Sequence, residues 1–184
     1  MYSYCYTTYQ SPIGTLTLAG DDSHLAGLWI EGQKYFGGSL TQPMTAADPH
    51  RLPAPLASAC GWLDRYFSGA KPLPSELPLA PAGSDFRQLV WKILCEIPYG
   101  EVMTYGQIAQ EAARLMGRLS MSGQAVGNAV GHNPISIIIP CHRVVGTKGS
   151  LTGYAGGIPK KIRLLKHEGV DVSRFFVPKK GAAL

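Results

Sequence analysis

The chain has 184 residues, of which 45% are apolar, and a formal net charge of +5 at pH 7. This length suits one domain of ordinary size or two small ones, and the apolar content excludes a wholly disordered chain. The apolar runs are too short to cross a membrane, and the first ten residues lack the basic and apolar segments of a secretory signal. We therefore expect a cytoplasmic protein.

The charge is unevenly distributed along the chain. Residues 1–84 carry four basic and six acidic side chains, a net charge of −2, whereas residues 85–184 carry thirteen basic and six acidic, a net charge of +7. This difference indicates two domains, the second of which meets a polyanion such as nucleic acid. A basic face that is merely solvated is the alternative.

The four cysteines, Cys5, Cys60, Cys95 and Cys141, form no CxxC pair and no regular spacing. Without an export signal, free thiols in a reducing compartment are expected. A structural metal would need ligand pairs a few residues apart, and only Cys141 has a histidine that close, so we expect no metal site.

The first eighty residues predict a small antiparallel sheet with one helix. Three runs rich in β-branched and aromatic residues are separated by turn residues, at Tyr4–Tyr9, Ile13–Leu18 and Leu25–Ile30. Residues 37–55 have no period and are expected to form a loop. Leu56–Phe67 has apolar residues at helical spacing.

Four prolines between residues 71 and 83 indicate an extended, semi-rigid segment. We place the domain boundary there, which gives domains 1–80 and 81–184.

The second half predicts a helix-turn-helix. A helix capped by Ser84 or Asp85 ends before Pro98. Thr104 and Gln107 then form a capping box for a helix over Tyr105–Leu115. A second short helix, Ser122–Gly131, follows a polar turn, and two short helices joined in this way are typical of the motif.

The remainder predicts a buried strand at Ile135–Ile139 and a last helix near Pro159–His167, closed by Gly169. The basic residues of that helix either steer the protein toward DNA or form a solvated face. They are Lys160, Lys161, Arg163 and Lys166.

The second helix of the helix-turn-helix is unusually rich in small residues, among them Gly123, Gly127 and Gly131. Each glycine inside a helix costs about 1 kcal/mol relative to alanine, so the sequence favours close approach of another surface. That surface is either a protein partner or a nucleic-acid backbone. Small residues would suit insertion into the minor groove, and the free N–H groups at the helix start would face phosphates.

Cys141 lies between a proline and a basic pair, in Ile139-Pro140-Cys141-His142-Arg143. A thiol becomes nucleophilic when cationic or hydrogen-bonding neighbours stabilise its thiolate. Cys5, Cys60 and Cys95 lack such neighbours and are expected to be small core residues.

The sequence PCHRV at 140–144 resembles that of the O6-alkylguanine-DNA alkyltransferases. Asn133-Pro134 before it, the GYAGG at 153–157 and the LLKHEG at 164–169 extend the resemblance. It implies an α+β fold, with a ribonuclease H-like N-terminal domain and a helical, winged helix-turn-helix C-terminal domain. It also implies direct-reversal DNA repair, in which an alkyl group moves once from O6-alkylguanine to the protein's own cysteine.

The resemblance implies roles for five residues around the sulfur. Cys141 would accept the alkyl group, and His142 would take the thiol proton through a water molecule. Glu168 would orient His142 and balance its charge. Asn133 would tie the helix-turn-helix to the active-site segment, and Arg143 would brace the loop. A nucleophile, a base and a carboxylate that orients the base form one activated unit.

Further residues would hold the guanine. Tyr105 would donate to the leaving guanine and crowd the backbone phosphate, which rotates the nucleotide out. The carbonyls of Cys141 and Val144 would accept from the guanine amino group. Tyr154 would form a wall of the pocket, and the N–H of Ala155, which replaces a serine of many relatives, would contact O6.

The DNA-binding helix departs from the usual pattern of the family. Gln124 stands where many members have an arginine that enters the base stack, and Met116–Ser122 is several residues longer than usual. A glutamine can still hydrogen-bond the orphaned base. Gly123 and Gly127 would allow the close approach to DNA.

The resemblance implies duplex DNA containing O6-alkylguanine as the partner, with O4-alkylthymine a further candidate, and a monomer without cofactor. Two other hypotheses remain open. A cysteine hydrolase would need a distant histidine, an oxyanion hole and repeated turnover. A winged-helix protein that only senses alkylated DNA would not need Cys141.

Overall fold

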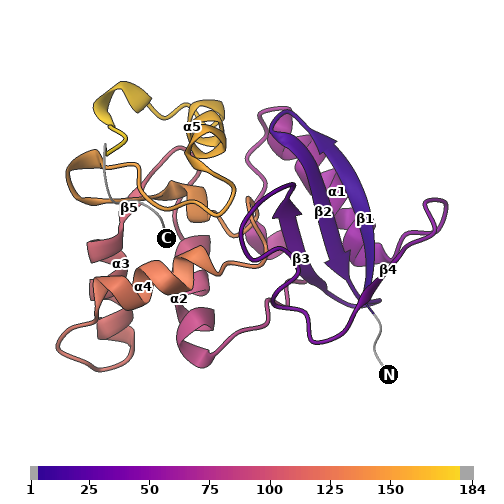
Figure 1. Cartoon of the computed structure of the whole chain (residues 1–184), viewed down its shortest axis with the longest axis horizontal. Helices are drawn as coiled ribbons and strands as arrows, with labels where there is room; N and C mark the ends of the chain where they lie inside the picture. Colours follow the sequence, from indigo (N-terminus) through magenta and orange to yellow (C-terminus); the bar gives the residue numbers. More distant parts are fainter. Residues whose placement is uncertain (1–3, 179–184) are drawn as a thin grey trace. The chain divides into compact units, whose positions relative to one another are not determined.

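The computed structural model describes residues 4–178 and divides into two compact units (Figure 1). Of the described residues, the first unit comprises 4–82 together with the short segment 134–138, and the second comprises 83–133 and 139–178. The first contains a sheet and the second is mostly helical, so the α+β fold class is confirmed. No helix between residues 4 and 178 is long and apolar enough to cross a membrane.

The sheet of the first unit combines an antiparallel meander with one parallel edge strand. Its strand order is β3-β2-β1-β4; β2 pairs antiparallel with β1 and with β3, and β4 pairs parallel with β1. The meander was expected from the sequence, but β4 lies in a segment that we predicted to be a loop. The strands are β1 (Tyr4–Ser11), β2 (Gly14–Gly20), β3 (Leu25–Ile30) and β4 (Met44–Ala46).

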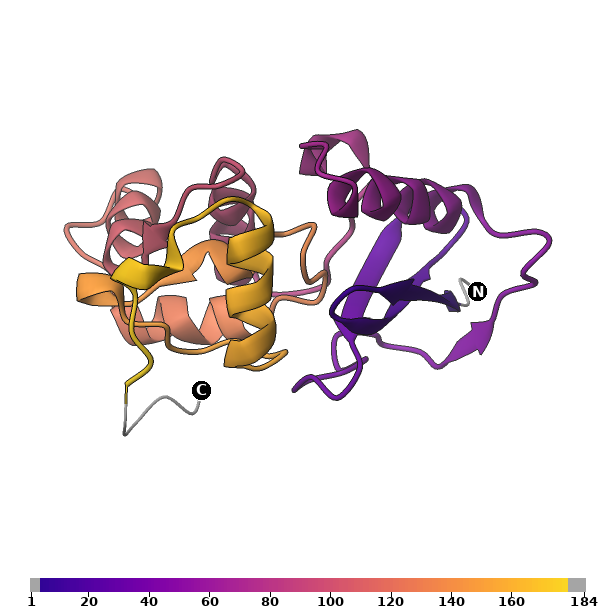
Figure 2. The same ribbon diagram turned by 90° about the horizontal axis from the view of Figure 1, so that it is seen from above.

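One helix, α1 (Ala54–Phe67), covers a face of this sheet (Figure 2). It begins two residues before the predicted start, with Pro55 in its first turn, where a missing N–H costs nothing. Its apolar side chains recur at helical spacing and are buried with Leu16 and Leu18 of β2. These helix residues are Leu56, Ala59, Trp62, Leu63 and Tyr66.

All six residues of β3 are buried, because other segments cover its open edge. Leu25 pairs with Leu79, and Leu28 pairs with Ile135 of the segment 134–138. The predicted strand at Ile135–Ile139 is therefore wrong beyond its first residue. Ile137 has a φ of 71°, a left-handed conformation that a strand cannot contain, so the chain turns there.

Three helices form the first part of the second unit, and they pack against one another. They are α2 (Asp85–Cys95), α3 (Tyr105–Leu115) and α4 (Gly123–Gly131). Hydroxyl groups cap all three helices, and the capping box predicted at Thr104 and Gln107 is present. The predicted helix-turn-helix is thus confirmed as α3, the turn 116–122, and α4.

The second part of this unit is a loop-rich layer that ends in α5 (Ile158–His167). Two short strands, β5 (Met103–Thr104) and β6 (Val144–Val145), pair in parallel. A small apolar core joins β6 to α5 and consists of Val145, Leu151, Leu165 and Val170. Single turns of 3₁₀ helix occur at Pro74–Glu76, Cys141–Arg143 (η2), Thr147–Gly149 and Val172–Arg174.

Candidate active site

Cys141 begins a single turn of 3₁₀ helix, η2, which is followed directly by β6. We predicted it at the end of a strand, but the N–H of Cys141 donates to the carbonyl of Ile139 at 2.8 Å, which tightens the chain into a turn. The residue is buried, with 4% of its surface exposed. The turn places Cys141, His142 and Arg143 together in the second unit.

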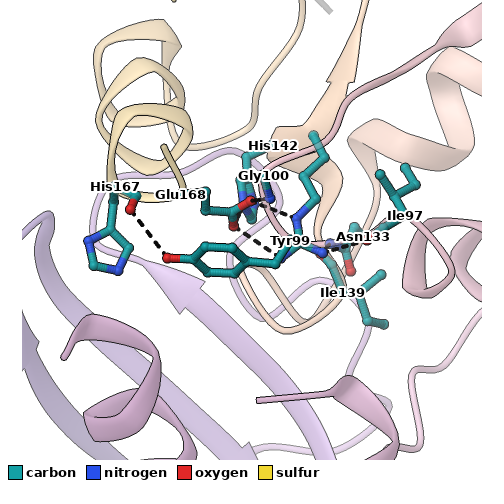
Figure 3. Close-up of polar contacts among 9 residues, drawn as sticks. Ile97, Tyr99, Gly100, Asn133, Ile139, His142, His167 and Glu168 are labelled. Carbon is teal, nitrogen blue, oxygen red and sulfur yellow. Dashed lines mark hydrogen bonds and ion pairs between the residues drawn. The ribbon is translucent and has the colours of Figure 1, made fainter. Parts of the chain in front are cut away.

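Asn133 connects the helix-turn-helix to this turn, as the resemblance implies. It follows the C-cap residue of α4, and its Nδ2 donates to the carbonyl of Ile139 at 2.8 Å (Figure 3). Asn133 is 4% exposed. This buried hydrogen bond from the Asn133 side-chain amide fixes the end of α4 to the residues that lead into Cys141.

His142 and Glu168 form a fully buried pair. The Nε2 of His142 lies 2.6 Å from Oε1 of Glu168, and neither side chain is exposed (Figure 3). Since a carboxylate only accepts hydrogen bonds, Nε2 carries the proton and Nδ1 holds a lone pair. Nδ1 is buried and has no hydrogen-bond partner between residues 4 and 178. The neutral ring is therefore ready to take a proton through Nδ1.

Arg143 holds Glu168 on its other side. Its Nε donates to Oε2 of Glu168 at 2.8 Å and its Nη2 donates to Oε1 at 3.1 Å, a bidentate pair. Its Nη1 donates to the carbonyl of Ile97 at 2.6 Å, and the N–H of Gly100 donates to Oε2 of Glu168 at 3.2 Å. These bonds tie Glu168 to Arg143 and to the backbone, and they account for a carboxylate in the interior.

These contacts set the charges of the pair. Burial lowers the pKa of His142 below its ordinary 6.5 and outweighs the opposing pull of Glu168, whose charge Arg143 shares. Burial alone would raise the pKa of Glu168, but the hydrogen bonds from His142 and Arg143 hold it well below its usual range. At neutral pH the arrangement is a neutral histidine beside an ionised glutamate.

The surroundings of the Cys141 thiol do not favour its ionised form. Burial raises the pKa of Cys141 above its ordinary 9.0, against the opposing effects of the Asn133 amide and the Lys161 ammonium. Cys141 therefore stays a thiol at neutral pH, and a nearby base is required for it to become a nucleophile.

Lys161 is a component of the site that the sequence did not reveal. We expected it to be a surface charge of the last helix, but it is fully buried. Its Nζ donates to the carbonyls of Val144 at 2.5 Å, Thr152 at 3.0 Å and Gly153 at 3.4 Å. Burial lowers its pKa to about 8. Lys161 thus fastens the loop after β6 to the start of β6.

Tyr105 reaches the same loop from the start of α3. Its hydroxyl donates to the carbonyls of Thr152 and Gly153, each at 3.4 Å, and burial raises its pKa to about 12. The next residues of the loop are Tyr154 and Ala155, both half-buried. The Tyr154 hydroxyl is buried without a hydrogen-bond partner in the described part of the chain, so it is free to contact a ligand.

The exposed face of α4 carries no large apolar side chain. Gly123, Gln124 and Asn128 are exposed, and a Cβ added at Gly123 would meet nothing within 4 Å. Gly123 is therefore not required for packing within the described part of the chain. Gly127, in contrast, is buried.

All four cysteines are free thiols. Within residues 4–178, no three His, Cys, Asp or Glu side chains gather in a way that could hold a metal ion.

The structure combines a sheet unit, a helix-turn-helix unit and a buried group of Cys141, His142 and Glu168. Comparison with known protein families identifies the family to which this combination belongs. Residues 4–81 match the ribonuclease-like domain of 6-O-methylguanine DNA methyltransferase, and residues 85–170 match the DNA binding domain of the same family.

Individual relatives agree with these matches. A methylated-DNA–protein-cysteine methyltransferase of Mycobacterium bovis is 44% identical over 89% of this chain and 91% of the relative. One of Methanosarcina barkeri is 41% identical over 89% of this chain and 96% of the relative. The crystal structure of Mycobacterium tuberculosis OGT in complex with DNA is 42% identical, with a TM-score of 0.75, and covers 92% of this chain and 94% of that one.

The chain belongs to the 6-O-methylguanine DNA methyltransferase family.

Proposed function

We propose that this protein repairs duplex DNA by moving the alkyl group of O6-alkylguanine to the sulfur of Cys141. The observation that carries the proposal is the buried base that directly follows the thiol in the sequence. Nδ1 of His142 has no partner in the described residues, and Glu168 fixes the proton on the opposite nitrogen. A base held in this tautomer serves proton removal from a neighbouring thiol.

The transfer balances without a cofactor. His142 takes the thiol proton, through a water molecule, and the sulfur attacks the alkyl carbon. A carbon–sulfur bond forms as the bond from that carbon to O6 breaks, and the electron pair stays on the guanine, which is protonated as it leaves. A thioether does not hydrolyse, so the protein reacts once and keeps the group.

The substrate must leave the base stack, since the O6 substituent of a paired guanine cannot reach a buried sulfur. Tyr105 exchanges its 3.4 Å hydrogen bonds to the carbonyls of Thr152 and Gly153 for one to the leaving guanine, and it crowds the phosphate. Tyr154 forms a wall of the pocket. The N–H of Ala155 contacts O6, and the carbonyls of Cys141 and Val144 accept from the amino group. Val144 already accepts from Lys161, but a carbonyl has a second lone pair for this purpose.

DNA binding is assigned to α4, whose exposed Gly123, Gln124 and Asn128 permit close approach to the backbone. The crystal structure of the mycobacterial relative in complex with DNA supports DNA binding by this protein. We assign residues 1–80 to a supporting domain and residues 81–184 to the DNA-binding and acceptor domain, in a cytoplasmic monomer.

The test is a titration with duplex DNA that carries one O6-methylguanine. The proposal predicts that each molecule gains one methylene unit (~14 Da, a methyl group in place of a proton) and then stops, since the nucleophile is consumed. The matched variant Cys141→Ser should gain nothing, while Cys60→Ser should behave as the wild type. Repeated turnover would favour a cysteine hydrolase. Binding without any mass change would favour a sensor of alkylated DNA.

A further inference from the structure

The exposed face of α4 carries no bulky side chain. Its exposed residues are Gly123, Gln124 and Asn128, and Asn128 already accepts from Arg87 at 3.3 Å. Cβ atoms added at Gly123 or Gly131 would meet nothing within 4 Å. Such a face can lie close to a DNA backbone, but it holds nothing large and apolar to fill the gap left by an extruded base.

The turn before α4 carries the exposed apolar side chains that the helix lacks. Leu119, four residues before the start of α4, is 106% exposed, more than any other large hydrophobic residue in the described part of the chain. Leu115 is 48% exposed and Met116 is 37% exposed at the entrance to the same turn. Three exposed apolar side chains within five residues of sequence favour a contact surface.

The charge around the turn favours DNA as the contact. The sequence from residue 112 to residue 167 contains no aspartate or glutamate, and the exposed Arg118 directly precedes Leu119. Arg114, before Leu115, is ion-paired with Glu111 at 2.6 Å. An exposed apolar side chain beside an arginine is the combination that proteins use to enter the minor groove and separate two base steps.

We propose that the α3–α4 turn, residues 116–122, is a second DNA-contacting element and that Leu119 inserts between base steps beside the extruded nucleotide. Inserted there, the side chain occupies the gap in the stack and slows the return of the nucleotide. Arg118 then lies near the phosphates and offsets their charge. This inference rests on the proposed function and adds to it the residue that keeps the damaged nucleotide outside the helix.

Two substrates separate this effect from the chemistry at Cys141. The rate of methyl transfer is measured by intact mass for duplex DNA with one O6-methylguanine, and for the free O6-methylguanine base, which needs no extrusion. The variants are Leu119→Ser, the conservative Leu119→Met, and Leu73→Ser as a matched control. Leu73 is a leucine of the first unit with 61% exposure.

We expect Leu119→Ser to react about tenfold or more slowly than wild type with duplex DNA, because an unfilled stack favours return of the base. Its rate with the free base should be unchanged. Leu119→Met should restore most of the duplex rate, and Leu73→Ser should match the wild type with both substrates.

Equal rates of Leu119→Ser and wild type on duplex DNA would overturn the inference. An equal loss on both substrates would also overturn it, because the residue would then support the fold. A wild-type protein that takes no methyl group from either substrate would overturn the proposed function, and this inference with it.

Discussion

The two units differ in what they bury. Within residues 4–178, the buried polar residues of the first unit are Gln33 and Ser136, which hydrogen-bond to each other at 3.1 Å. The second unit buries five in the same range, and four of them are titratable or charged. They are Asn133, His142, Arg143, Lys161 and Glu168.

This difference separates a part of the protein built for stability from one built for chemistry. Burying an ion costs several kcal/mol even after the protein relaxes, and replacing a buried pair by apolar side chains is often stabilising. In the second unit the buried charged side chains belong to the site around Cys141, where charges in a water-excluded interior control proton transfer. The following variants test this comparison, from the largest expected effect to the smallest.

Replacement of His142 should affect the reaction most. His142→Gln keeps a donor to Glu168 but loses the basic Nδ1, so we expect methyl transfer from duplex DNA to slow by about 100-fold or more. Since burial lowers the histidine pKa below its ordinary 6.5, the wild-type rate should fall only as the pH drops below that value. The variant should lack this acid limb.

Single-turnover rates across the pH range, measured by intact mass, check this prediction. His50→Gln, an exposed histidine of the first unit, is the control and should keep both the rate and the acid limb. An unchanged acid limb in His142→Gln would contradict the assignment of His142 as the base.

Glu168→Gln tests the buried charge network. It leaves the Arg143 guanidinium buried without its counterion, and we expect the free energy of unfolding at pH 7 to fall by about 3–5 kcal/mol. The depressed carboxyl pKa means that the contribution is full above the unfolded pKa and is lost as the pH falls through the folded one. The variant's deficit should therefore shrink in acid.

Urea unfolding provides the measurement, with Glu76→Gln as the matched control from the first unit. Glu76 pairs with Arg65 at 2.6 Å on the surface, where both side chains are more than one third exposed, so its loss should cost less than about 1 kcal/mol. Equal losses of unfolding free energy for Glu168→Gln and Glu76→Gln would contradict the claim that only the second unit depends on a buried ion pair.

Lys161→Met gives the smallest effect on stability, and the size of the effect depends on pH. Burial lowers the lysine pKa from 10.5 to about 8, so between these values the unfolded chain binds more protons than the folded one. The stability of the wild type relative to the variant should therefore rise from pH 8 to 10.5, by up to roughly 3 kcal/mol.

Denaturant unfolding of both proteins at several pH values in this range measures the difference. Lys166→Met, on the exposed side of the same helix, should show no such change. A difference between wild type and Lys161→Met that stays constant with pH would contradict the buried position of the ammonium group.

Local patterns predicted much of the fold, because short-range interactions determine them. The hydroxyl and amide of Thr104 and Gln107 satisfy backbone groups within one turn, so their spacing alone marked the start of α3. Residues adjacent in sequence, such as Cys141 and His142, needed no tertiary information to be placed together.

Tertiary contacts decided what the sequence could not. Ile135–Ile139 has the composition of a buried strand, but only Ile135 pairs with β3 and the backbone turns at Ile137. Lys161 was classed by its charge as a surface residue. Its spacing carried a signal, since Lys161, Leu164, Leu165 and Glu168 recur at the interval of one buried helix face.

The central claim is that one particular sulfur receives the alkyl group, and tandem mass spectrometry of the digested protein tests it most directly. After reaction with duplex DNA that contains O6-methylguanine, we predict a methyl thioether on Cys141 and unmodified thiols at Cys5, Cys60 and Cys95. A methyl group on Cys95, whose thiol pKa burial raises to about 11, would contradict the account. Methanol released with no protein-bound methyl group would contradict it as well.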